Sequence, residues 1–71
     1  MDIIYSDHAK KRMKKRGIEG WEVEHILKFP SYTKKSSDGR IEAIGSVKNR
    51  MLKVIFTKAE NYIKIITLIL K

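Results

Sequence analysis

The sequence predicts an α+β domain in which two helices pack on an antiparallel sheet, in the order β-α-α-β-β-β with room for one further strand. Two patterns indicate this fold. Apolar residues recur with the helical period as far as Pro30, and from Ser31 onward they alternate as they do in strands. The chain length gives the third indication, since 71 residues can bury only one small core. We therefore expect residues 1–71 to form a single domain.

The first strand is expected at residues 2–5, where the sequence DIIY is rich in β-favouring side chains. Ser6-Asp7 follows, and both residue types favour the N-cap of a helix. The first helix should run from about Asp7 to Arg16. It should end there because Gly17 readily adopts the left-handed conformation that closes a helix.

A second helix should begin near Glu19 or Gly20. It must end by Phe29, because Pro30 cannot continue a helix and also restricts the residue before it. Its apolar positions fall on one face, which we expect to be buried, and they are Val23, Ile26 and Leu27.

The remainder of the chain is expected to form strands joined by turns. Asp38-Gly39 is a turn signal that opens a hairpin, and the strand after it covers 40–47. A turn at Lys48-Asn49 leads to a strand at 51–57, and the turn KAEN leads to the last strand, YIKIITLIL. An additional short strand is expected near 32–36. The last strand is apolar on both faces near its end, which favours a central or partner-covered position.

The composition of the chain limits the classes of partner that it is expected to bind. Sixteen lysines and arginines against eight acidic residues give a net charge of +8, which favours nucleic acid, an acidic protein or an anionic surface. The chain has no cysteine and therefore no disulfide or thiolate metal site. Its N-terminus lacks the pattern of a signal peptide, and the apolar run 65–70 is too short to cross a membrane. We expect a cytoplasmic protein with no membrane association.

The first helix carries an unusual concentration of charge, with six cationic side chains in the seven positions 10–16. At about 100° per residue, its lysines point toward water. Three other side chains, spaced i, i+4 and i+8, form a ridge at the border of the core, where a planar guanidinium is better suited than an ammonium group. They are His8, Arg12 and Arg16.

This ridge could act on a phosphodiester. Arg12 and Arg16 would stabilise the charge that develops on the phosphate in the transition state. The helix N-terminus and Arg12 both favour the neutral imidazole of His8, the form that a general base needs to take a proton from a ribose 2′-OH. No metal or other cofactor is required. The candidate catalytic residues are therefore His8, Arg12 and Arg16.

Structural roles remain open for the same residues. Arg12 and Arg16 could close the helix pair through acidic partners at Glu19, Glu22, Glu24 or Glu42. His8 could cap or pack the helix, and the lysines could be a solvated face. However, like charges at i, i+4 cost helix stability, which favours an anionic partner. The candidate nucleic-acid-binding residues are Lys10, Lys11, Lys14, Lys15, Arg40 and Lys53.

On the second helix, His25 lies four residues after Trp21, a spacing more typical of packing at the edge of a core than of a ligand site. Two histidines with scattered carboxylates do not predict a zinc site. On the sheet, Arg50 adds charge, and Tyr32 and Tyr62 could stack on bases or be ordinary strand residues.

The motif His8-Ala9-x-x-Arg12-Met13-x-x-Arg16-Gly17-Ile18, with Asp38-Gly39-Arg40 and the later strands, resembles a small prokaryotic family of domains of unknown function. That family looks like an outlying branch of the RelE/ParE toxin superfamily, close in layout to BrnT-type ribonuclease toxins. The resemblance implies a RelE/ParE-like fold and a metal-independent endoribonuclease of a toxin-antitoxin system. Its partners would be RNA and an antitoxin.

RelE-type catalysis uses basic and tyrosine side chains on the sheet and near the C-terminal end. This sequence ends in ITLILK and has no late His, Tyr or Arg, so we place the site on the first helix, with Arg40 and Lys53 as contributors from the sheet. The alternative is a noncatalytic basic module that binds RNA, DNA or an acidic protein. In that case the last strand could pair with another chain, including a second copy of this one.

Overall fold

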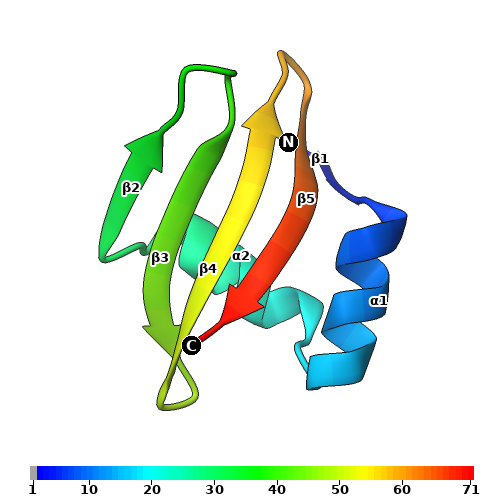
Figure 1. Cartoon of the computed structure of the whole chain (residues 1–71), viewed down its shortest axis with the longest axis vertical. Helices are drawn as coiled ribbons and strands as arrows, with labels where there is room; N and C mark the ends of the chain where they lie inside the picture. The colour runs from blue at the N-terminus through cyan, green and yellow to red at the C-terminus, as the bar shows by residue number, and fades with distance from the viewer. Residues whose placement is uncertain (1) are drawn as a thin grey trace.

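A computed structural model describes residues 2–71 and confirms the α+β fold class and the element order (Figure 1). The chain forms two helices and five strands. In order they are β1 (Asp2–Tyr5), α1 (Asp7–Arg16), α2 (Gly20–Lys28), β2 (Tyr32–Lys35), β3 (Ile41–Val47), β4 (Arg50–Lys58) and β5 (Tyr62–Leu70). The helix ends agree with those expected from Gly17 and Pro30, and the additional short strand is present as β2.

The strands form one sheet in the order β1-β5-β4-β3-β2. The pairs β2–β3, β3–β4 and β4–β5 are antiparallel, as the alternating pattern predicts. In contrast, β1 pairs with β5 in parallel, with Asp2 opposite Tyr62, so the sheet is mixed. The sequence of a four-residue strand does not indicate which strand it will pair with. The parallel pairing of β1 with β5 was therefore not part of the antiparallel sheet expected from the sequence.

One face of the sheet carries the core. There α2 packs on β3 and β4, while α1 packs on β5. Gly45 on β3 allows the close approach of α2, because a Cβ at this position would lie 3.0 Å from Cδ1 of Ile26. The buried hydrophobic cluster combines both helices with the three central strands, and its members are Ala9, Ile18, Val23, Ile26, Ala43, Val47, Leu52, Val54, Phe56, Ile65 and Leu68.

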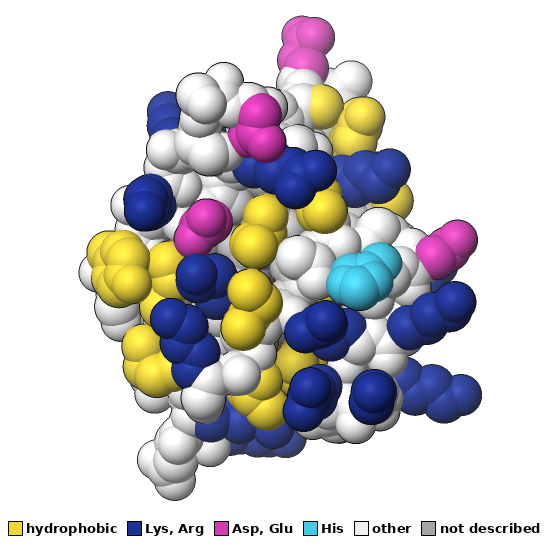
Figure 2. Space-filling model, in the orientation of Figure 1, with side chains coloured by type: hydrophobic (Ala, Val, Ile, Leu, Met, Phe, Trp, Pro, Cys, Tyr) yellow, Lys and Arg dark blue, Asp and Glu magenta, His cyan; other side chains and the backbone are white. Residues whose placement is uncertain are grey.

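The opposite face of the sheet, which we call the open face, has no helix over it (Figure 1). Hydrophobic and charged side chains are interspersed there (Figure 2).

The last strand is central, as its apolar sequence predicts. On one side β5 pairs with β4, and on the other it pairs with β1 along residues 62–65. Beyond this stretch α1 lies beside β5 (Figure 1). On the side away from β4, β1 already occupies residues 62–65 of β5, so a second copy of the chain could not pair with β5 along that stretch. The expected homodimer through this strand otherwise stays a prediction. The open edges of the sheet belong to β1 and β2.

Candidate functional site

The position of α1 is fixed by Ser6, its N-cap residue. The Ser6 hydroxyl accepts a hydrogen bond from the backbone N–H of Ala9 at 3.0 Å and donates one to the carbonyl of Ile66 at 2.7 Å. The backbone N–H of Ser6 also donates to the carbonyl of Ile65. One residue therefore starts the helix and attaches it to β5. At the other end Gly17 closes the helix with φ of 66°, as expected.

The inward face of α1 is narrow. Ala9 is fully buried and Met13 packs against the core, whereas the lysines of the helix are exposed. The helix thus presents most of its circumference to solvent. That arrangement follows from the sequence, in which only these two helix positions are apolar.

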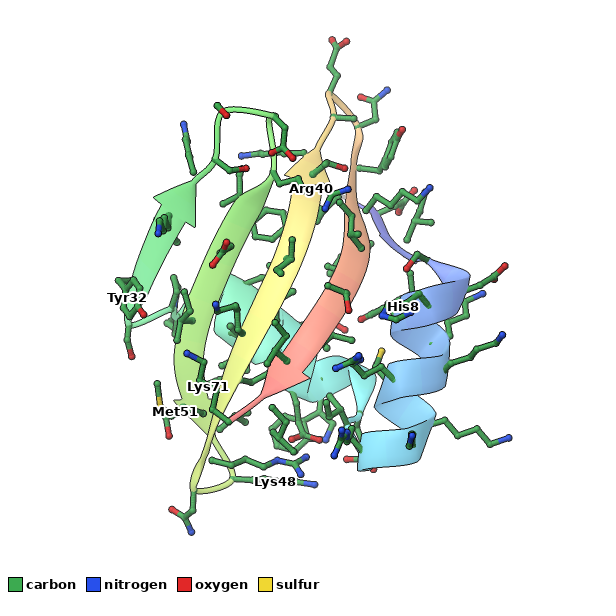
Figure 3. The ribbon with its side chains drawn as sticks, viewed as in Figure 1. His8, Tyr32, Arg40, Lys48, Met51 and Lys71 are labelled. Carbon is green, nitrogen blue, oxygen red and sulfur yellow. The ribbon has the colours of Figure 1, made fainter. Side chains whose placement is uncertain are left out.

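Five side chains on one side of α1 line a shallow depression of about 190 Å³, which we call the basic groove. They are His8, Lys11, Arg12, Lys15 and Arg16. The three predicted catalytic residues thus lie together, and no acidic side chain lines the groove. Arg12 is half-buried, as its predicted position at the border of the core requires, but Arg16 is exposed. His8 is exposed on α1 beside β5 (Figure 3).

The four predicted lysines of α1 divide between two sides. Lys11 and Lys15 join the basic groove, and Lys10 and Lys14 do not line it. Figure 2 shows the histidine and several neighbouring blue side chains on the same side of the molecule as the open face.

The arginines of the groove do not have the acidic partners that the sequence left open. Within residues 2–71, neither Arg12 nor Arg16 forms an ion pair. Three of the four carboxylates in question bind other cations and Glu24 binds none within the described residues 2–71, so the alternative of a helix pair closed by Arg12 and Arg16 is wrong. The observed pairs are Glu22 with Arg50, Glu19 and Glu22 with Lys48, and Glu42 with Lys53.

Glu22 is the centre of that structural network, and its side chain is fully buried. One carboxylate oxygen accepts a 2.8 Å hydrogen bond from Nη2 of Arg50, and the other accepts one from the backbone N–H of Glu19. Burial alone would raise the pKa of Glu22. The hydrogen bonds from Glu19 and Arg50 and the charges of Arg50 and Lys48 outweigh it, so the pKa lies below its usual value.

Arg40 and Lys53 do not reach the basic groove. Lys53 lies opposite Ile44 and alternates with buried neighbours, which places it on the open face, where it pairs with Glu42 at 3.3 Å. Arg40 pairs with Asp38 in the β2–β3 turn at 3.6 Å. Their charges are therefore partly compensated, unlike those of the groove, and they are not part of the same site.

The predicted core-edge role of Trp21 and His25 is wrong, because both lie on the exposed outer side of α2. Trp21 is 50% exposed, and its indole N–H donates to Oε2 of Glu19. His25 contacts the ring of Phe29, which is 68% exposed. The sequence did contain a signal for this surface. Trp21, His25 and Phe29 are spaced i, i+4 and i+8, on the side of α2 opposite its apolar stripe.

Residues 2–71 contain neither a metal-binding cluster nor a membrane-spanning helix. No group of three His, Cys, Asp or Glu side chains is arranged to hold a metal ion. Neither helix has the length and apolar character needed to cross a membrane.

The fold and the groove define a small basic α+β domain whose first helix carries an uncompensated cationic surface. The chain belongs to the DUF4258 family, a domain of unknown function, whose model matches residues 5–69. No curated protein matches the chain, and no solved structure matches it.

Proposed function

We propose that this protein is a metal-independent endoribonuclease of the toxin type and that the basic groove is its active site. One observation carries the proposal. The groove gathers His8, Arg12 and Arg16 with two lysines and contains no carboxylate to neutralise them. An anionic phosphodiester is the ligand that such a site favours.

The chemistry follows from the side chains present. As the general base, His8 removes the proton from a ribose 2′-OH, and the 2′-oxygen attacks the adjacent phosphorus. The bond from phosphorus to the 5′-oxygen breaks, and that oxygen takes a proton from water. His8 then gives the proton it holds to the resulting hydroxide, which restores the base. Arg12 and Arg16 stabilise the negative charge on the phosphoryl oxygens during the transfer. The products are a 2′,3′-cyclic phosphate and a 5′-hydroxyl end.

The resemblance to the RelE/ParE superfamily and to BrnT-type toxins supports the same activity. It also suggests an antitoxin as the protein partner, and such a protein would be expected to present acidic side chains to the groove. The sheet residues on which RelE-type catalysis relies have no equivalents near the end of this chain. The proposal therefore rests on α1.

The test is cleavage of an end-labelled RNA of mixed sequence in EDTA. The wild-type protein is compared with Arg12→Ala and with His8→Ala, whose exposed position makes it safe for the fold. Lys35→Ala is the matched control, because it removes a positive charge from β2 at the far edge of the sheet. Circular dichroism establishes that each variant is folded.

We expect the wild type and Lys35→Ala to cut the RNA and leave 2′,3′-cyclic phosphate ends, and both groove variants to lose at least 100-fold in rate. Equal cleavage by all four proteins would identify a contaminating nuclease. Intact RNA in buffer leads to a repeat in a translating extract, and intact RNA there as well would refute the endoribonuclease.

The second candidate is a noncatalytic module that binds RNA through the same groove. Lys11 and Lys15 favour it, because they extend the cationic surface beyond what catalysis requires. For such a module, neutralising any groove cation lowers the affinity gradually. For the enzyme, loss of His8 abolishes cleavage and leaves RNA binding almost unchanged.

A further inference from the structure

The outer side of α2 carries a surface that the proposed activity does not use. Five residues line a depression of about 260 Å³ there, and we call them the aromatic stripe: Trp21, Glu24, His25, Lys28 and Phe29. A second depression, of about 380 Å³, adjoins it and shares two of these residues. Its other lining residues are aliphatic, namely Ile3, Leu27 and Ile63.

The aromatic side chains of the stripe are held in place although they are exposed. Trp21 is fixed by its hydrogen bond to Glu19, and the Lys48 ammonium lies 5.3 Å from its ring centroid. The rings of His25 and Phe29 are 5.4 Å apart. Exposed aromatic residues that are already ordered lose little freedom on binding, which is a property of the residues that dominate protein interfaces.

The charge on this side of the molecule is balanced, in contrast to the basic groove. Glu24 and Lys28 belong to the stripe, and next to it Glu19 pairs with Lys48. Within residues 2–71, neither Glu24 nor Lys28 forms an ion pair. A neutral aromatic surface on a chain of net charge +8 is poorly suited to RNA, which requires excess positive charge.

The stripe is complementary to itself. If two copies of α2 pack antiparallel about a twofold axis near His25, Trp21 of each copy lies beside Phe29 of the other. The same arrangement brings Glu24 of each copy next to Lys28 of the other, so two ion pairs form across the axis. We infer that the aromatic stripe is a homodimer interface and that its occupant is a second copy of this chain.

This dimer is independent of the proposed nuclease activity. In Figure 1, α2 lies behind the sheet and α1 lies beside β5. Pairing through α2 therefore leaves both basic grooves accessible.

The first measurement is the mass of the protein in solution by sedimentation equilibrium, over a range of concentrations that reaches about 1 mM. We expect a dimer for the wild type and at least a tenfold weaker dimer for Phe29→Ser, since the aromatic partner of Trp21 across the interface is lost. Lys64→Glu, on the open face, is the control and should dimerise as the wild type does. A wild type that is monomeric throughout the range would overturn the inference.

Charge reversal tests the antiparallel arrangement. Glu24→Lys and Lys28→Glu each place like charges across the axis, so each variant alone should dimerise at least tenfold more weakly. When the two variants are mixed, every pair across the axis is again opposite in sign, and a heterodimer should form with close to wild-type affinity. The variant that carries both substitutions should also dimerise with close to wild-type affinity.

A dimer that persists in all these variants would use another surface and would contradict the inference. Loss of the dimer without recovery in the mixture would contradict the antiparallel contact. Both substitutions lie on the exposed side of α2, and circular dichroism of each variant separates loss of association from loss of folding.

Discussion

At the level of single residues, Glu22 is the side chain whose burial most requires compensating contacts. It is the one buried charged side chain among residues 2–71, and two of its contacts come from Arg50 and from the backbone of Glu19. Replacing it with a neutral residue removes the negative charge that compensates the guanidinium of Arg50, whose side chain is about three-quarters buried. Arg50 would then be left with an unpaired charge next to the core.

We expect Glu22→Gln to lower the free energy of unfolding by about 3 kcal/mol, because removing one partner of a buried pair leaves the other uncompensated. Urea denaturation at neutral pH measures this change. The matched control is Glu60→Gln in the exposed β4–β5 turn, which should change the stability by less than about 0.5 kcal/mol. Equal effects of the two substitutions would show that the Glu22 network contributes nothing specific.

The same residue makes stability depend on pH. Its pKa is lowered in the folded state, so its contribution is complete above the unfolded pKa, near 4.5, and is lost as the pH falls through the folded value. Urea denaturation from pH 7 down to pH 3 should therefore show the wild type losing more stability than Glu22→Gln. Parallel curves for the two proteins would exclude this role.

Part of that acid sensitivity should survive in the variant. Asp38 also has a lowered pKa, because the Ser36 hydroxyl and the backbone N–H of Arg40 donate hydrogen bonds to its carboxylate. This residue is fully exposed in a turn, so its share is small.

At the level of elements, the contact between α2 and β3 depends on the absence of a side chain at Gly45. A methyl group there would lie 3.0 Å from Cδ1 of Ile26 and 3.5 Å from the carbonyl oxygen of Phe29. Gly45→Ala should destabilise the protein by about 1–2 kcal/mol through overpacking. Thermal unfolding followed by circular dichroism gives the measurement.

A double-mutant cycle identifies the cause. Ile26→Val removes the Cδ1 atom that the new methyl group would meet, so Gly45→Ala should cost less in that background. If the two costs simply add, the Phe29 carbonyl rather than the Ile26 side chain limits the approach.

The attachment of α1 to the sheet gives another prediction. Ser6→Ala removes both hydrogen bonds of the hydroxyl and should destabilise the protein by about 1 kcal/mol. If the basic groove is a nuclease site, cleavage should also fall, because α1 is then held less firmly beside β5. Conversely, Ser6→Asp keeps an N-cap acceptor and should preserve the helix while losing the hydrogen bond to Ile66. A Ser6→Ala protein of unchanged stability would contradict the role assigned to this residue.

Sequence patterns were sufficient for the elements whose signals are local. Gly17 and Pro30 end the helices, and Asp38-Gly39 and Lys48-Asn49 form turns where their residue types predict them. The parallel pairing of β1 with β5 was not predictable, since it joins segments about 60 residues apart. The Glu22–Arg50 pair was not predicted for the same reason, because its two residues lie 28 positions apart.

The candidate site follows the same rule. Helical spacing alone placed His8, Arg12 and Arg16 on one ridge, and the structure brings them together in the basic groove. Lys11 and Lys15 join them on the same geometric ground, since they lie three and seven residues after His8 and all five lining residues belong to α1. The ribonuclease activity of these groove residues stays a prediction.

At the level of the whole molecule, the positive charge is unevenly compensated. Ion pairs neutralise cations on the sheet and beside α2, but none involves the basic groove among residues 2–71. The groove is therefore expected to dominate the attraction of polyanions, whether or not the bound RNA is cut.

The salt dependence of RNA affinity tests this distribution. A plot of the logarithm of the binding constant against the logarithm of salt concentration should become shallower by about 0.7 for each groove lysine replaced by alanine, at Lys11 or Lys15. Lys35→Ala, at the opposite edge of the sheet, should leave the slope unchanged. Equal changes from all three substitutions would indicate diffuse binding over the whole surface.

The pairing of β1 with β5 also determines when α1 can dock on the sheet during synthesis of the chain. The residues of the basic groove are made early, but α1 rests on β5, the last strand to be translated. A nascent chain that has not yet released β5 from the ribosome therefore cannot dock α1 on the sheet. A truncation within the final strand should therefore release α1 from the sheet, although it removes no residue of the basic groove. If the groove has the proposed ribonuclease activity, that activity would arise only after β5 has been synthesised.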